Sequence, residues 1–144
     1  MKSCLLSVAM CLLLLGGKAQ RASAPALKEF EAFWKKLHTA IIKKDYQALS
    51  QYTEFPLVVK KNLADTTVQT VGREEFPVFF NGYLELPAAG DFGNKYGLLR
   101  ARKTLNEDDM ALVTDDSASV GDFEFQKVNG GWKLVYVYAT AEEE

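Results

Sequence analysis

Residues 122–139 constrain the fold of this chain more than any other stretch. They form two runs rich in Phe, Val, Tyr and Trp on either side of Asn129-Gly130. An Asn-Gly step supplies the two positive-φ residues of a type I′ turn, so a long antiparallel hairpin is predicted. Apolar side chains occupy both alternating positions of the second run, which is typical of a central strand. We expect one face to carry Trp132, Leu134, Tyr136 and Tyr138, and the other to carry Val135, Val137 and Ala139.

An amphipathic helix that could cover one face of this hairpin is predicted over residues 27–43. Its apolar residues recur at three- and four-residue steps, and Pro25 suits the first turn. His38, the only histidine, lies at the border of the apolar stripe, where a histidine without a chemical role is the simpler interpretation. The residues expected to be largely buried are Phe33, Trp34, Leu37 and Ile41.

The rest of the chain is predicted to add two helices and two strand pairs. Asp45 is the expected N-cap of a short helix that reaches Tyr52, and a third helix is predicted within 73–86, with Pro77 in its first turn. The strand pairs are 55–59 with 67–71, and 98–104 with 110–114. Together with the hairpin, these elements predict an α+β domain. Its curved, mainly antiparallel sheet of about six strands would pack around the long N-terminal helix.

The N-terminus has the pattern of an export signal. Lys2 precedes an apolar run over residues 4–15, and small residues follow. This run is too short to span a membrane, so a secretory signal peptide is predicted. Cleavage is expected after Ala19, with a second candidate site after Ala24. Residues 20–144 would then form a single periplasmic or secreted domain.

Composition excludes several kinds of site from this domain. Both cysteines, Cys4 and Cys11, fall in the predicted signal, which leaves no disulfide, zinc-thiolate site or cysteine nucleophile. Removing Lys2 and Lys18 from the 17 basic residues leaves 15 against 19 acidic ones, and this balance argues against nucleic acid as a partner. No cofactor is predicted, because the chain has no glycine-rich phosphate loop. No metal site is predicted either, and residues 106–109 lack the spacing of a calcium loop.

Several segments carry a family resemblance that covers essentially the whole predicted mature chain. They are Phe33, Ala40-Ile41, Asp45, Leu49, Phe55-Pro56-Leu57, Phe123, Phe125 and the Gly130 to Leu134 run. In this order they resemble the nuclear-transport-factor-2-like superfamily, which includes ketosteroid isomerase and polyketide cyclases. The resemblance implies a cystatin-like cone, in which the curved sheet wraps the long helix and leaves an apolar pocket at the wide end. It indicates a fold rather than an activity, because one fold hosts unrelated functions.

The enzymatic motifs of this superfamily do not transfer to the chain. Its isomerases use a carboxylate base with a tyrosine and a protonated acid, and its dehydratases pair a histidine with an aspartate. Here no acid is flanked by apolar residues that would raise its pKa. We therefore expect an exported, non-catalytic small-molecule-binding or accessory protein with an aromatic-lined pocket. Two alternatives stay open: an isomerase- or dehydratase-like enzyme that uses His38 or a pocket aspartate, and a protein–protein interaction module.

The expected ligand is a small apolar or carboxylated molecule. Arg100 and Arg102 are two residues apart on a predicted strand and would share a face, from which guanidinium groups could pair with a carboxylate. A solvated face on which they pair with Glu107 or Glu124 is the simpler interpretation. The predicted ligand contacts are Trp34, Tyr52, Phe79, Tyr83, Arg100, Tyr136 and Tyr138.

A homodimer is also expected. The outer face of the sheet would carry Val135 and Val137, and an uncovered apolar patch at that position favours a symmetric partner. No membrane span is expected in the mature domain.

Overall fold

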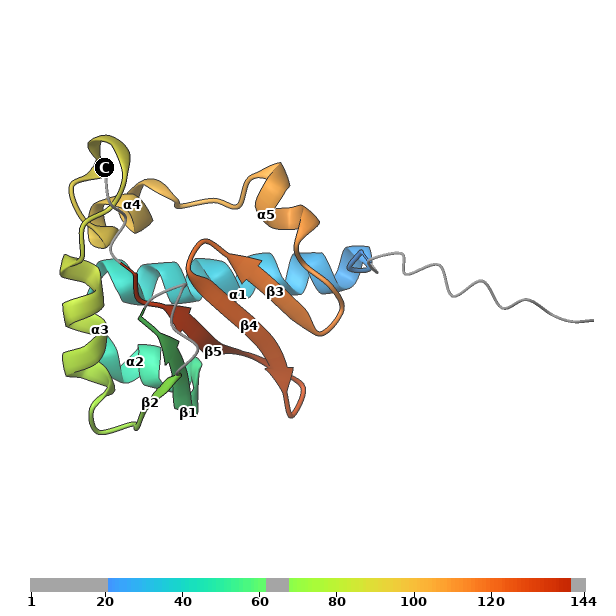
Figure 1. The fold of residues 1–144 in the computed structure, drawn as a ribbon. Helices are drawn as coiled ribbons and strands as arrows, with labels where there is room; N and C mark the ends of the chain where they lie inside the picture. The colour runs from blue at the N-terminus through green and yellow to red at the C-terminus, as the bar shows by residue number, and fades with distance from the viewer. Residues whose placement is uncertain (1–20, 62–67, 141–144) are drawn as a thin grey trace, which may run out of the picture.

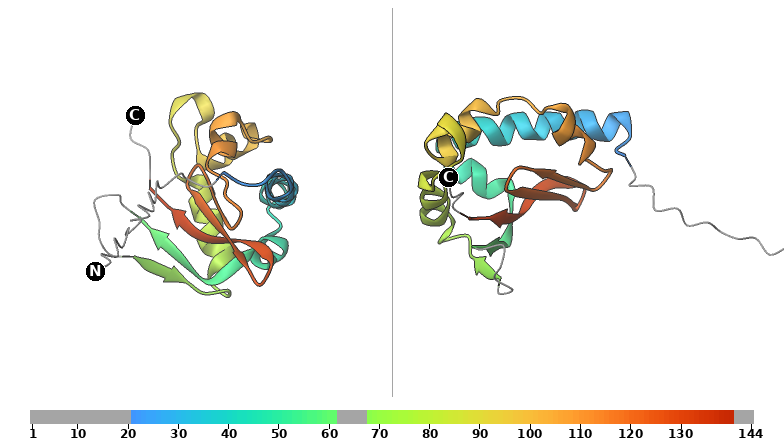
Figure 2. Two further views of the ribbon diagram at one scale, coloured as in Figure 1. Left: turned by 90° about the vertical axis from the view of Figure 1, so that its right-hand side faces the viewer. Right: turned by 45° about the horizontal axis from the view of Figure 1, so that its top comes forward.

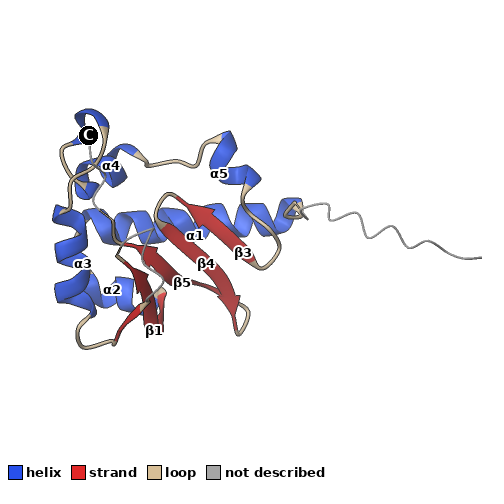
Figure 3. Ribbon diagram, in the orientation of Figure 1, coloured by secondary structure: helices blue, strands red, loops and turns tan. Residues whose placement is uncertain are grey.

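The computed structural model describes residues 21–61 and 68–140, and every structural statement below concerns these residues. The predicted signal peptide and the predicted loop at Ala64-Asp65 lie outside them. The helices are α1 (Ala24–Ile42), α2 (Tyr46–Gln51), α3 (Phe76–Glu85), the 3-10 turn η1 (Gly90–Phe92), α4 (Lys95–Ala101) and α5 (Glu107–Ala111). The strands are β1 (Thr53–Lys60), β2 (Gln69–Val71), β3 (Ser117–Val120), β4 (Phe123–Val128) and β5 (Gly131–Tyr138) (Figures 1 and 3).

The described strands form one curved sheet in the order β2-β1-β5-β4-β3. All neighbouring pairs are antiparallel except β1 and β5, which run parallel. Helix α1 lies along one face of this sheet, as its end-on view in Figure 2 makes clear. The α+β class, the long N-terminal helix and the mainly antiparallel curved sheet are therefore confirmed.

Aromatic side chains fill the space between α1 and the sheet. The Phe30 ring centroid lies 4.9 Å from that of Trp132 and 5.4 Å from that of Phe125, both in edge-on geometry. Such pairs add about 0.5–1.5 kcal/mol beyond their burial. The four α1 residues predicted to be buried, Phe33, Trp34, Leu37 and Ile41, are at most 9% exposed, which confirms that prediction.

The predicted hairpin is confirmed, and so is its central position. Asn129 and Gly130 have φ values of 51° and 81°, as a type I′ turn requires, and β5 lies between β1 and β4. The predicted faces of β5 are wrong beyond Leu134. Leu134 pairs with Phe125 but Tyr136 pairs with the adjacent Glu124, so β5 contains one extra residue.

This β-bulge inverts the alternation of side chains along β5. As a result Trp132, Leu134 and Val137 are buried, whereas Tyr136 and Tyr138 are only half-buried. Val137 therefore contributes to the core and not to an outer apolar patch. The homodimer stays a prediction, and the outer-face residues available to it include Val58 and Tyr136, which pair across β1 and β5.

The shorter predicted elements are confirmed around β1. Asp45 caps α2 by accepting a hydrogen bond from the Ala48 amide over 3.1 Å, and Pro77 lies in the first turn of α3. Strands β1 and β2 pair antiparallel, with Leu57 opposite Val71.

The strand pair predicted over 98–104 and 110–114 is wrong, because these segments contribute to α4 and α5. Asn94 caps α4 by accepting from the Gly97 amide over 2.9 Å. Asn106 and Asp109 form a reciprocal capping box at the start of α5. Both caps favour helical turns over extended chain, and this removes two predicted strands. Strand β3, which pairs antiparallel with β4, was not predicted as a separate strand, so the described sheet has five strands instead of about six. Arg100 and Arg102 consequently do not share a strand face.

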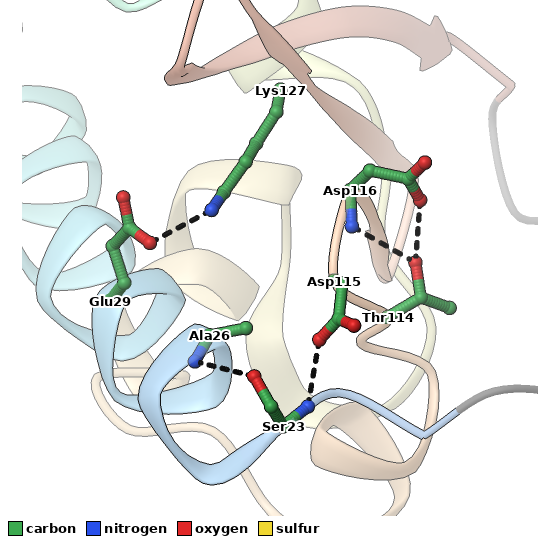
Figure 4. A network of polar contacts seen from close by, with 7 residues as sticks. All are labelled: Ser23, Ala26, Glu29, Thr114, Asp115, Asp116 and Lys127. Carbon is green, nitrogen blue, oxygen red and sulfur yellow. Dashed lines mark hydrogen bonds and ion pairs between the residues drawn. The ribbon is translucent and has the colours of Figure 1, made fainter.

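The start of α1 is tied to the chain before β3 (Figure 4). The Ser23 hydroxyl accepts from the Ala26 amide over 3.3 Å, while the Ser23 amide donates to Asp115 Oδ1 over 2.8 Å. This backbone hydrogen bond holds the pKa of Asp115 below its ordinary value. Lys127 on β4 adds an ion pair with Glu29, 2.9 Å apart, so the second turn of α1 is held to the sheet.

A chain that begins at Pro25 is expected to be less stable than one that begins at Gln20. It lacks the Ser23 cap, and loss of an N-cap costs about 1 kcal/mol. Urea unfolding of the two chains measures the difference. Ser23→Ala in the longer chain should reproduce only the part that comes from the hydroxyl, because it keeps the hydrogen bonds that the Ser23 and Ala22 amides donate to Asp115 and Val113. Equal stability would show that the cap is dispensable.

Candidate functional site

A cluster of charged and polar side chains lies where α3, α4 and the turn between β3 and β4 meet. Lys95 Nζ lies 3.0 Å from Asp122 Oδ2, and the Tyr83 hydroxyl donates to the same oxygen over 2.7 Å. The Lys95 side chain is fully buried, whereas that of Asp122 is 19% exposed. Lysine is almost never fully buried unless it is paired. The burial of Lys95 in its ion pair with Asp122 is therefore the most unusual feature of the described interior.

Local structure explains how the three side chains meet. Tyr83 lies on the buried face of α3, with its ring centroid 5.5 Å from that of Phe123. Lys95 is the first residue of α4, and its amide donates to the Leu86 carbonyl over 2.8 Å. Gly121 has a φ of 55°, in the left-handed region that glycine adopts without strain, and the tight turn it makes places Asp122 at the start of β4.

A cavity of about 100 Å³ adjoins this cluster. Arg102, at the C-terminal end of α4, borders it with a side chain that is 31% exposed. A Cβ atom at Gly121 would lie 3.1 Å from Arg102 Nη1, so the glycine leaves room for the guanidinium group. The lining residues are Tyr83, Leu98, Leu99, Arg102, Val120, Gly121 and Asp122.

The guanidinium group of Arg102 is only weakly engaged. Its Nη1 atom is 3.5 Å from Asp109 Oδ1, a long contact for a hydrogen bond. Asp109 also accepts from the Asn106 amide through its other oxygen, over 3.1 Å. A guanidinium group carries five N–H donors, so Arg102 has donors to offer to a ligand in the cavity.

His38 ties α1 to α4 beside this cavity. Its Nε2 atom lies 2.8 Å from the Leu99 carbonyl oxygen, and the residue is buried. A carbonyl only accepts, so Nε2 carries a proton and donates it. His38 was expected at the border of the apolar stripe of the helix, but it lies inside the protein. There it holds Leu99 at the cavity wall.

The structure does not bring the seven predicted contacts together. Tyr83 lines the cavity, whereas Trp34 is buried on α1 with its ring centroid 6.2 Å from that of His38. Tyr52 is the C-cap of α2 and borders a groove between α1 and α2. Phe79 is half-buried on α3.

The other three predicted contacts lie away from the cavity. Arg100 is exposed on α4 and does not line the cavity. Arg102, which was predicted to share a strand face with Arg100, lines it instead. Tyr136 and Tyr138 lie on the outer face of the sheet, with ring centroids 4.6 Å apart. The Tyr138 hydroxyl donates to Glu124 Oε1 over 3.0 Å, and this hydrogen bond raises the pKa of Tyr138.

Sequence reasoning missed Lys95 and Asp122. Asp122 follows a glycine between two strands, which is an ordinary turn position. Lys95 has no distinguishing neighbour in the sequence. The one available signal was the Asn94 cap, which would have placed Lys95 on a helix.

No family model, curated protein or solved structure matches this chain, so the superfamily resemblance stays a prediction. None of the helices in the described part of the chain is both long and apolar enough to cross a membrane. Among residues 21–61 and 68–140, no three His, Cys, Asp or Glu side chains gather in a way that could hold a metal ion.

Proposed function

We propose that this protein is an exported, non-catalytic binding protein of the nuclear-transport-factor-2-like cone fold, and that it holds a small carboxylate beside Arg102. Arg102 carries the proposal, because its weakly engaged guanidinium group borders a small, partly open cavity. Guanidinium and carboxylate groups form two parallel hydrogen bonds, an arrangement that a solvated lysine does not reproduce. Leu98 and Leu99 offer apolar contact to a short carbon chain.

The cavity limits the ligand to a few atoms. Its 100 Å³ corresponds to the volume of about three water molecules, which suits a carboxylate of about four to six non-hydrogen atoms. The best small ligands gain about 1.5 kcal/mol per non-hydrogen atom. Acetate would then bind no more tightly than about 6 kcal/mol, which corresponds to a Kd in the tens of micromolar.

Asp122 favours binding over catalysis. Its Oδ2 atom already accepts from Tyr83 and pairs with Lys95, so this oxygen is occupied by groups of the protein itself. An enzyme of the isomerase or dehydratase type is the second candidate, supported by the carboxylate that lies against a tyrosine hydroxyl. In the proposed binding protein, Asp122 instead neutralises Lys95 and orients Tyr83.

Titration with acetate, propionate and butyrate, followed by NMR amide shifts, tests the proposal. Arg102→Met is expected to weaken binding at least tenfold, because it removes the guanidinium group and keeps an unbranched side chain. Arg100→Met is the matched control, since Arg100 lies exposed on the same helix, and it should bind as the unaltered protein does.

Equal binding by the Arg102→Met and Arg100→Met variants would contradict the proposal. Thermal unfolding of both variants verifies that each one folds. Native mass spectrometry of protein purified from its own source should also detect a bound small carboxylate. If the unaltered protein turned over a substrate and Asp122→Asn abolished the turnover, the enzymatic alternative would replace the proposal.

A further inference from the structure

A second hollow lies on the surface between α1 and α2. Its volume is about 530 Å³, and it is shallow and largely open to solvent. It shares no lining residue with the Arg102 cavity. Its lining consists of Ala32, Lys35, Lys36, Thr39, Ala40, Lys43, Asp45, Ala48 and Tyr52.

The rim of this groove is positively charged. Residues 32–44 contain four lysines and no acidic residue, although the whole chain has a formal net charge of −2. Lys35, Lys36 and Lys43 line the groove and are exposed. None of the three forms an ion pair with another described residue. The nearby Asp45 carboxylate is engaged in capping α2.

Small side chains line part of this groove, and Lys36 lies between Ala32 and Ala40 on the same face of α1. Ala32 and Ala40 are eight residues apart on one face of α1, which spans about 12 Å, and Ala48 on α2 faces the same hollow. Tyr52 borders the groove with its ring edge-on to Phe33, at a centroid distance of 5.8 Å. The small side chains leave space along the helix that larger ones would fill.

We propose that this groove binds an alkyl carboxylate of medium chain length. The carboxylate pairs with the lysines of the rim, and the alkyl chain lies along the small side chains of the groove. The simpler interpretation of these lysines is a solvated face without a ligand. In that interpretation, the position of Lys43 is explained by its favourable interaction with the C-terminal end of α1. The interaction with the helix end is confined to the last turn, so it does not extend to Lys35 and Lys36, which lie nearer the middle of the helix and above the same hollow.

The test uses decanoate as the probe, at concentrations below those at which it forms micelles. Amide shifts are expected at Ala32, Thr39, Ala48 and Tyr52. The double variant Lys36→Glu/Lys43→Glu should bind decanoate at least tenfold more weakly. Lys28→Glu is the matched control, because Lys28 is exposed on α1 outside the groove, and it should leave the affinity unchanged.

Two more variants distinguish binding in the groove from binding at the Arg102 cavity or at any cationic surface. Ala32→Leu fills part of the groove without changing the charge and should also weaken decanoate binding. Arg102→Met should not affect it, so failure here is distinguishable from failure at the cavity. Equal binding of decyltrimethylammonium, or equal weakening by Lys28→Glu, would overturn the proposal. A third result would also overturn it: a glutamate-rich helical peptide shifts these amide signals and decanoate does not. The occupant of the groove would then be a protein segment.

Discussion

Replacing Asp122 with alanine is expected to lower the free energy of unfolding by about 3 kcal/mol. Removing one partner of a buried ion pair typically costs about 3–5 kcal/mol, because the remaining buried charge loses a counter-charge. The lower end applies here, since the Asp122 side chain is 19% exposed while that of Lys95 is fully buried. The Tyr83 hydroxyl also loses its 2.7 Å hydrogen bond to the carboxylate.

The double variant Lys95→Met/Asp122→Leu separates the ion pair from the packing. Replacing both partners by apolar side chains of similar size is often neutral or stabilising, so this variant should recover the part of the loss that comes from the ion pair. The hydrogen bond from Tyr83 to the carboxylate is still lost in it. Asp91→Ala is the control, because Asp91 is an exposed acid in η1. Urea unfolding measures all three. A cost below about 0.5 kcal/mol for Asp122→Ala, within the range of ordinary surface substitutions, would show that Lys95 does not depend on this carboxylate.

The elements predicted correctly are those specified by residues close together in the chain. Asn129-Gly130 sets the hairpin turn, the apolar stripe of α1 sets its buried face, and Asp45 caps α2 three residues away. Each of these signals acts over a few residues and depends little on the rest of the fold. The sequence alone was therefore sufficient for the α+β class and for the centre of the sheet.

The elements predicted wrongly failed for two different reasons. Residues 98–104 alternate like a strand, but the Asn94 cap just upstream starts a helix instead. In β5 the alternation was predicted correctly only as far as Leu134, because the bulge before Tyr136 depends on pairing with β4 and has no marker in the sequence. That single extra residue moved two predicted ligand contacts, Tyr136 and Tyr138, to the outer face.

The candidate site could not be read from sequence because it is assembled from distant segments. Tyr83 and Asp122 are 39 residues apart, and they meet only because α3 packs across the end of β4. The fully buried position of Lys95 likewise depends on tertiary packing and not on its neighbours in the chain. Aromatic residues were overvalued as ligand contacts for a related reason, since many of them fill the core beneath α1.

Replacing Leu37 with alanine should cost about 2–5 kcal/mol of unfolding free energy, because it removes a fully buried side chain and leaves a cavity. Leu37→Met nearly conserves volume and should cost less than about 1.5 kcal/mol. Lys36→Ala, at the exposed position beside it, should change stability by no more than about 0.5 kcal/mol. Urea unfolding with an unchanged m-value would assign these differences to the folded state. A loss below about 1 kcal/mol for Leu37→Ala would mean that the centre of α1 is not held by this face, and the packing of the helix against the sheet would have to be reconsidered.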